Sequence, residues 1–187
     1  MKRTALILPI VVIAAAVGLS SIFIVDEREK ALVLQFGQIK AVREDPGLYF
    51  KVPLIQEVVR YDDRILGLDI QPLEVTPLDD RRLVVDAFAR YRISDVRRFR
   101  QAVGAQGLTL AESRIDTLLQ AQTREVLGSV TSSEILSQDR AGLASRIRDA
   151  GRTQAESLGV EIIDVRLKRT DLPDQNLDAT FARMRAE

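Results

Sequence analysis

The stretch "RLVVDAFARYRI", Arg82 to Ile93, has the clearest strand pattern in the chain. Apolar and polar side chains alternate along it, which is the period of a strand with one buried face. We expect the core to receive one set of side chains, Val85, Ala87, Ala89, Tyr91 and Ile93, and the opposite face to carry Asp86, Phe88, Arg90 and Arg92. The pattern therefore predicts a long strand at the centre of a folded module.

Helix signals follow this strand directly. Ser94 is placed to cap a helix over "DVRRFRQAV". Thr109 and Glu112 have capping-box spacing before a longer helix that runs to about Val130, and Thr131 with Glu134 repeats that spacing before a short helix.

A third helix and a last strand complete this region. The helix is "RAGLASRIRDAGRTQAESLG", with Gly159 as its C-terminal stop. The strand, Val160 to Pro173, changes its alternation once, which predicts a β-bulge. Residues 77–173 are thus predicted to form an α+β module.

The region before it, residues 26–76, is predicted to be a small β-rich module. Glu29 to Ile39 reads as a strand with Leu32, Leu34 and Phe36 on one face and Gly37 at a turn. Further short strands are separated by the turn "EDPG" and by Gly67, Pro72 and Pro77.

The N-terminus carries a long apolar run. Lys2 and Arg3 precede Ala5 to Val25, which holds no charged residue and would make roughly 31 Å of helix, about one hydrocarbon core. We expect residues 1–25 to be an uncleaved signal anchor, although a cleaved signal peptide with Leu6 to Ile13 as its apolar region is the alternative. The flanking charges place the short N-terminus in the cytoplasm and the rest outside it.

Composition excludes several kinds of chemistry. The chain has no cysteine and no histidine, which excludes disulfides, thiol nucleophiles, His-based triads and most zinc sites. Lys and Arg balance Asp and Glu at 27 each, so the long-range attraction of a nucleic-acid binder is missing. We therefore predict no catalytic residues, no cofactor, no metal and no nucleic acid.

Two carboxylate pairs, Asp62–Asp63 and Asp79–Asp80, are the remaining candidates for acid–base chemistry. Both lie beside arginines in predicted turns, where aspartate is favoured on conformational grounds. A solvated turn is the expected role, and a membrane-anchored hydrolase that uses these carboxylates is the competing one.

Three segments are candidates for contact with lipid or with other subunits. In "DPGLYFKVP", about twenty residues past the apolar run, we expect Leu48, Tyr49, Phe50, Lys51 and Val52 to meet the membrane interface, unless Leu48 and Phe50 fill the core of the β module. Ala14 and Gly18 have the small-xxx-small spacing of packed membrane helices. Residues 174–187 begin a helix whose apolar residues, Leu177, Phe181 and Met184, have coiled-coil spacing, and it reads as the start of something longer.

Four segments together resemble a known family. These are "EREKALVLQFGQI", "EDPGLYFKVPLIQEVVRYDDRI", "LVVDAFARYRISD" and "LGVEIIDVRLKRTDLP", followed by a helix that contains "ARMRAE". Their order resembles the stomatin/prohibitin/flotillin/HflKC (SPFH, band 7) family, and within it the HflC branch.

The resemblance implies two stacked subdomains, SPFH1 and SPFH2, and a long C-terminal coiled coil. It also implies a non-enzymatic subunit of the bacterial inner membrane, mostly periplasmic, that assembles with an HflK-like paralogue into a cage. That cage would surround the FtsH protease and limit its access to membrane substrates. A stomatin-like organiser of membrane microdomains, independent of FtsH, is the alternative within the family.

Overall fold

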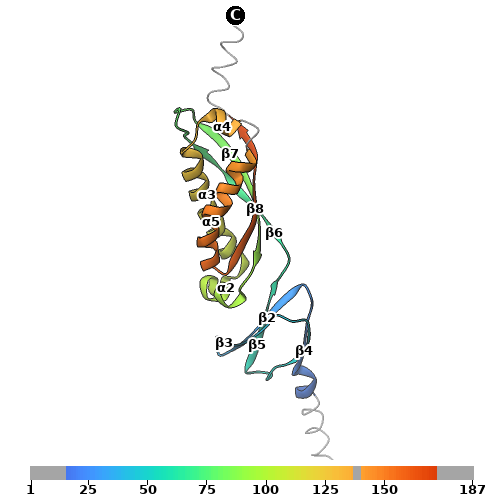
Figure 1. Cartoon of the computed structure of the whole chain (residues 1–187). Coiled ribbons are helices and arrows are strands. Elements are labelled where there is room, and N and C mark those ends of the chain that lie inside the picture. Colours follow the sequence, from blue (N-terminus) through green and yellow to red (C-terminus); the bar gives the residue numbers. More distant parts are fainter. Residues whose placement is uncertain (1–15, 137–139, 172–187) are drawn as a thin grey trace, which may run out of the picture. The chain divides into compact units, whose positions relative to one another are not determined.

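The computed structural model describes residues 16–136 and 140–171, which fall into two compact units (Figure 1). The first unit ends at Arg64 and the second begins at Ile65. The sequence predicted this boundary after residue 76, which is wrong. Strand β6, Leu66–Val75, pairs along its length with β7, Leu83–Ile93, and so belongs to the second unit.

From residue 16 onward, the first unit contains five short strands in two sheets. Strand β2 (Glu29–Gln35) is central in one sheet, between β3 (Gln38–Arg43) and β5 (Gln56–Asp62). The other sheet is a ribbon of β1 (Ile22–Val25) and β4 (Gly47–Phe50). A small core joins them, made of Phe23, Val25, Ala31 and Val33 with Ala41, Tyr49 and Val58 at its margin.

The predicted membrane helix is wrong at its C-terminal end, because residues 22–25 form strand β1. Residues 16–20 are helical, but the helix does not continue to Val25. The Ser21 hydroxyl donates to the Val17 carbonyl at 2.8 Å, and the Ser21 carbonyl accepts from the Lys51 amide at 2.7 Å, which starts the pairing with β4. Among the described residues, no helix has both the length and the apolarity of a membrane span. The predicted anchor residues before Ala16, Ala14 included, lie outside the described part of the chain.

The second unit packs its helices on one face of an antiparallel sheet of order β6–β7–β8 (Figure 1). All five residues predicted for the core face of β7 are 1% exposed or less. Helices α3 (Leu108–Gly128) and α5 (Arg140–Ser157) cover this face. The unit also contains α2 (Val96–Val103), η1 (Gly104–Gln106), α4 (Ser132–Leu136) and β8 (Val160–Asp171).

Capping was predicted in part. Thr131 caps α4 as expected, because its hydroxyl accepts from the Glu134 amide at 3.4 Å. Asp95, and not Ser94, caps α2 by accepting from the amides of Arg97 and Arg98. Thr109 lies inside α3, which begins at Leu108 after Gly107. Glu112 instead accepts a hydrogen bond from the Tyr91 hydroxyl at 3.2 Å.

Gly159 holds α5, β8 and the start of α2 together. Its φ of +74° is the left-handed conformation expected of a helix stop. Its carbonyl accepts from the amides of Ser94 and Asp95 at 3.0 and 3.1 Å. A Cβ here would lie 2.4 Å from the Asp95 carbonyl oxygen and 2.6 Å from the Phe99 amide nitrogen.

Gly159→Ala should therefore destabilise the chain, by about 1–3 kcal/mol for the backbone conformation and further for the backbone clash. Gly128→Ala is the matched control, because its new Cβ meets nothing closer than the Thr76 carbonyl oxygen at 3.9 Å. Urea unfolding followed by circular dichroism measures both. Equal stability of the two variants would contradict this packing.

Candidate membrane-facing surface

The β1–β4 ribbon has two different faces. The register pairs Phe23 with Tyr49 and Ile24 with Leu48. Phe23 and Val25 are 7% and 2% exposed and pack on the core, whereas Ile24, Leu48 and Phe50 are 65%, 56% and 70% exposed. We call the four outward apolar side chains, Ile22, Ile24, Leu48 and Phe50, the ribbon face.

Tyr49 belongs to the packed face, contrary to the prediction that it meets the interface. Its ring lies 5.9 Å from that of Phe23, and the Arg43 guanidinium lies 4.9 Å above it. Its hydroxyl donates to the Asp45 carbonyl at 2.9 Å. The alternative that Leu48 and Phe50 fill the core is also wrong, because alternation places Tyr49 inward and those two outward.

Apolar side chains also gather at one end of this unit. Gln35, the last residue of β2, pairs with Gln56, the first residue of β5. The hairpin turn after Gln35 and the loop before Gln56 must therefore lie at the same end of the sheet. Phe36 is 83% exposed in the turn, Leu54 is fully exposed in the loop, and Val52 and Ile55 beside it are exposed as well.

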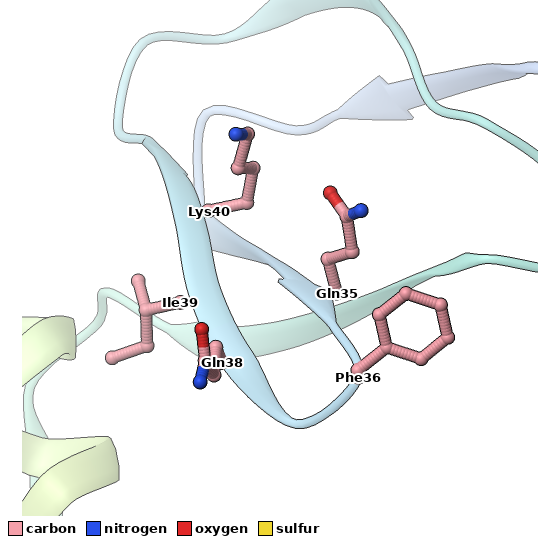
Figure 2. A pocket seen from close by; sticks show the side chains of 5 residues that line it. All are labelled: Gln35, Phe36, Gln38, Ile39 and Lys40. Carbon is pink, nitrogen blue, oxygen red and sulfur yellow. The ribbon is translucent and has the colours of Figure 1, made fainter.

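Phe36 and Leu54 both adopt a left-handed backbone, with φ of +50° and +69°. This conformation is unfavourable for large side chains. The backbone at these two positions therefore gives no reason for a phenylalanine or a leucine to stand there. Figure 2 shows Phe36 at the tip of the β2–β3 hairpin, beside a hollow that Gln35, Gln38, Ile39 and Lys40 line. The sequence prediction placed Phe36 with Leu32 and Leu34, but the turn separates it from those buried residues.

Polar groups border the ribbon face. Arg60 donates to the Ile24 carbonyl at 3.4 Å and lies 3.6 Å from the Glu29 carboxylate. Lys51 is half-buried, at the point where its amide extends the pairing to Ser21. An apolar face with a cation, Arg60, at its border suits the boundary between acyl chains and phosphates. Gly18, predicted to pack in the membrane, is exposed and has nothing within 4 Å of a built Cβ.

Three of the four paired carboxylates, those of Asp62, Asp63 and Asp79, are engaged in local structure. Asp62 binds Arg64 with a shortest distance of 2.5 Å, and this hydrogen bond lowers the pKa of Asp62. Asp63 lies 2.8 Å from the Lys30 amine. Asp79 accepts from the amide of Ser132 at 2.9 Å and from its hydroxyl, and these bonds lower the pKa of Asp79. These partners favour the turn and capping roles over a hydrolytic one.

The described residues contain no group of three or more acidic side chains that could hold a metal ion. The hollow in Figure 2 is lined by two amides, an aromatic ring, an isoleucine and one lysine, which offer no acid–base pair. The ribbon face and the apolar end of unit 1 are therefore the candidate binding surfaces of this unit, and both present apolar side chains.

Comparison with known proteins identifies the family of the chain. The profile of the SPFH domain / Band 7 family matches residues 23–187. The chain belongs to this family. Its mixed α+β fold confirms the predicted fold class, and the match begins at the ribbon, within two residues of Ser21.

Curated relatives are named HflC. Protein HflC of Haemophilus influenzae is 34% identical over 97% of this chain and 64% of its own length. Protein HflC of Buchnera aphidicola (Schizaphis graminum) is 32% identical over 90% of this chain and 61% of its own. The protein named "Modulator of FtsH protease HflC" in Escherichia coli K12 is 28% identical over 97% and 68%. The chain thus spans less than two thirds of the length of the first two relatives.

The two faces of β4 predict effects of different size on the stability of the chain. Tyr49→Ser removes a packed ring and should destabilise the chain by about 3 kcal/mol, as core aromatic truncations do. Phe50→Ser changes a side chain that lies outside the core of the unit and should lower the stability by less than Tyr49→Ser does. Thermal unfolding of the two variants in the same detergent measures this, and the reverse order would place Phe50 in the core.

Asp79 predicts a pH-dependent effect. Because its pKa is lowered in the folded state, its contribution to stability is present above the unfolded pKa of about 3.9 and is lost as the pH falls through the folded value. Asp79→Asn should be less stable than the native chain at pH 7, and the gap should shrink with acidification. Asp80→Asn is the control, and a gap of constant size from pH 7 to pH 3 would contradict the role of charge.

Proposed function

We propose that this chain is a membrane-anchored, non-enzymatic scaffold subunit of the HflC type that modulates an FtsH-like protease. The printed name of the Escherichia coli relative supports the modulating role. The ribbon face supports the seat on the membrane, and it is the observation that carries the proposal. The engaged carboxylates support a role without catalysis.

Helix length explains why the ribbon should touch lipid. If the apolar run were helical from Ala5 to Ser20, it would be about 24 Å long, shorter than the ~30 Å hydrocarbon core. The chain then turns into β1, whose outward side chains are apolar. Burial of the ribbon face in the headgroup boundary would add to the apolar length of the helix, with Arg60 near phosphates.

We further propose a single-pass topology in a bacterial inner membrane. The N-terminus would be cytoplasmic and both units periplasmic, since Lys2 and Arg3 precede the apolar run. Assembly with an HflK-like paralogue into a cage around the protease follows from the family resemblance. Its proposed contact surface, Leu177, Phe181 and Met184 on a C-terminal coiled coil, lies outside the described residues.

Insertion of the ribbon can be measured directly, because the chain has no cysteine of its own. Phe50→Cys labelled with bimane should emit at shorter wavelength in vesicles and be quenched by lipids that carry a nitroxide near the headgroup. Leu108→Cys on the second unit is the control, because Leu108 is also partly exposed but lies on α3. Equal quenching at both sites would contradict insertion of the ribbon into the membrane.

The modulating role is tested by degradation of a membrane substrate in cells that contain the protease and the HflK-like partner. Leu48→Gln with Phe50→Gln should shift the substrate half-life toward that of cells without this chain, because the seat is weakened. Leu108→Gln with Leu136→Gln changes two exposed leucines of the second unit and should act as wild type. If the wild-type chain inserts into the membrane but leaves the substrate half-life unchanged, the chain does not modulate the protease. The alternative, an organiser of membrane microdomains that is independent of FtsH, would then be favoured.

A further inference from the structure

Strand β8 is an open edge of the second unit. Among the described residues it pairs with β7 on one side and with no strand on the other. An open edge presents unpaired amide and carbonyl groups to any extended chain that approaches.

Two bulges confine this edge to a short segment. Asp86 pairs with Arg169 and Ala87 with Leu167, which leaves Lys168 as an extra residue. Arg90 pairs with Asp164 and Tyr91 with Ile162, which leaves Ile163 extra in the same way. Bulges twist an edge and interrupt its ladder. The regular part of the edge is therefore Asp164–Leu167.

A groove runs beside this same segment. Its walls are Asp164, Val165, Arg166 and Leu167 of β8 and Arg140, Ala141, Ala144 and Ser145 of α5. Figure 1 shows α5 alongside β8. The small side chains on this face of α5 leave room next to the strand, and Ala144 and Val165 are buried and apolar. The groove can thus take an aliphatic side chain of an added strand.

The charges of the groove favour an acidic ligand. Asp164 is held by Arg166 at 2.8 Å, so its charge is balanced. Arg140 is half-buried and makes no ion pair with another residue of the described part of the chain. The Arg140 guanidinium is therefore the group with which a carboxylate of a bound segment would pair.

We propose that the groove between α5 and β8 binds an extended segment of a partner protein in which an aliphatic and an acidic residue stand two positions apart, so that both side chains face α5. The segment adds a short strand to Asp164–Leu167. Its aliphatic side chain lies over Ala144 and Val165, and a carboxylate pairs with Arg140. This site is on the second unit and is independent of the proposed seat on the membrane.

Fluorescence anisotropy with the full chain in nanodiscs tests the proposal. The probe is a labelled peptide in which valine and glutamate stand two positions apart with threonine between them, compared with the same peptide carrying lysine for glutamate and with one N-methylated at every residue. The glutamate peptide should bind at least about tenfold more tightly than the lysine peptide, which corresponds to one favourable charge pair. N-methylation removes the amide donors and should abolish binding.

Variants of the groove complete the test. Arg140→Glu should weaken the glutamate peptide about tenfold or more, since a repulsive pair replaces an attractive one. Ala141→Trp should block the groove from an exposed helix position. Arg124→Glu, an exposed reversal on α3, is the control and should leave binding unchanged. Absence of saturable binding, equal binding of the N-methylated peptide, or equal losses in Arg140→Glu and Arg124→Glu would each overturn the site.

Discussion

The pairing of β1 with β4 decides which side chains of the first unit are inside and which are outside. Because successive residues of a strand point to opposite faces, the register that buries Phe23 and Val25 must expose Ile22 and Ile24. The same register turns Tyr49 inward and Leu48 and Phe50 outward. A shift of one residue would exchange the two sets, so the core of the unit and its proposed seat on lipid are two results of one constraint.

The pairing of β1 with β4 also determines how the proposed anchor connects to the first unit. Five residues past the start of the described helical segment, the chain leaves the helix and becomes a strand that is hydrogen-bonded to a second, distant segment. A helix that ends in such a ribbon is coupled to the folded unit without a flexible linker. The exposed apolar side chains at Phe36 and Leu54, both in unfavourable backbone conformations, lie at one end of the same unit. The ribbon face is the part of this unit for which we propose contact with lipid.

The sequence predicted best where one periodicity ran without interruption. Each residue on the core face of β7 was predicted correctly. The change of alternation in β8 correctly indicated a bulge at Ile163. The second bulge, at Lys168, was not predicted because the apolar pattern does not change there. Residues 22–25 were misassigned because an uninterrupted apolar run suits a membrane helix as well as a short strand with apolar side chains on both faces. Strand β6 was placed in the wrong unit because Pro72 and Pro77 were interpreted as breaks between strands. Its pairing with β7 depends on tertiary contacts, which the local sequence pattern does not show. Tyr49 was grouped with Phe50 because adjacent aromatics look alike until the register assigns them to faces.

A disulfide test of the β1–β4 register addresses the central claim most directly, because the chain has no native cysteine. Ile24→Cys with Leu48→Cys places two thiols at directly opposed, exposed positions of the ribbon. In the full chain in membranes this pair should oxidise to an intramolecular disulfide, whereas Ile22→Cys with Leu48→Cys, a diagonal pair at about 7–8 Å, should not. Failure of the opposed pair to cross-link, in a chain that is folded and inserted, would mean that the apolar run continues as a helix through Val25 and that the ribbon face does not exist.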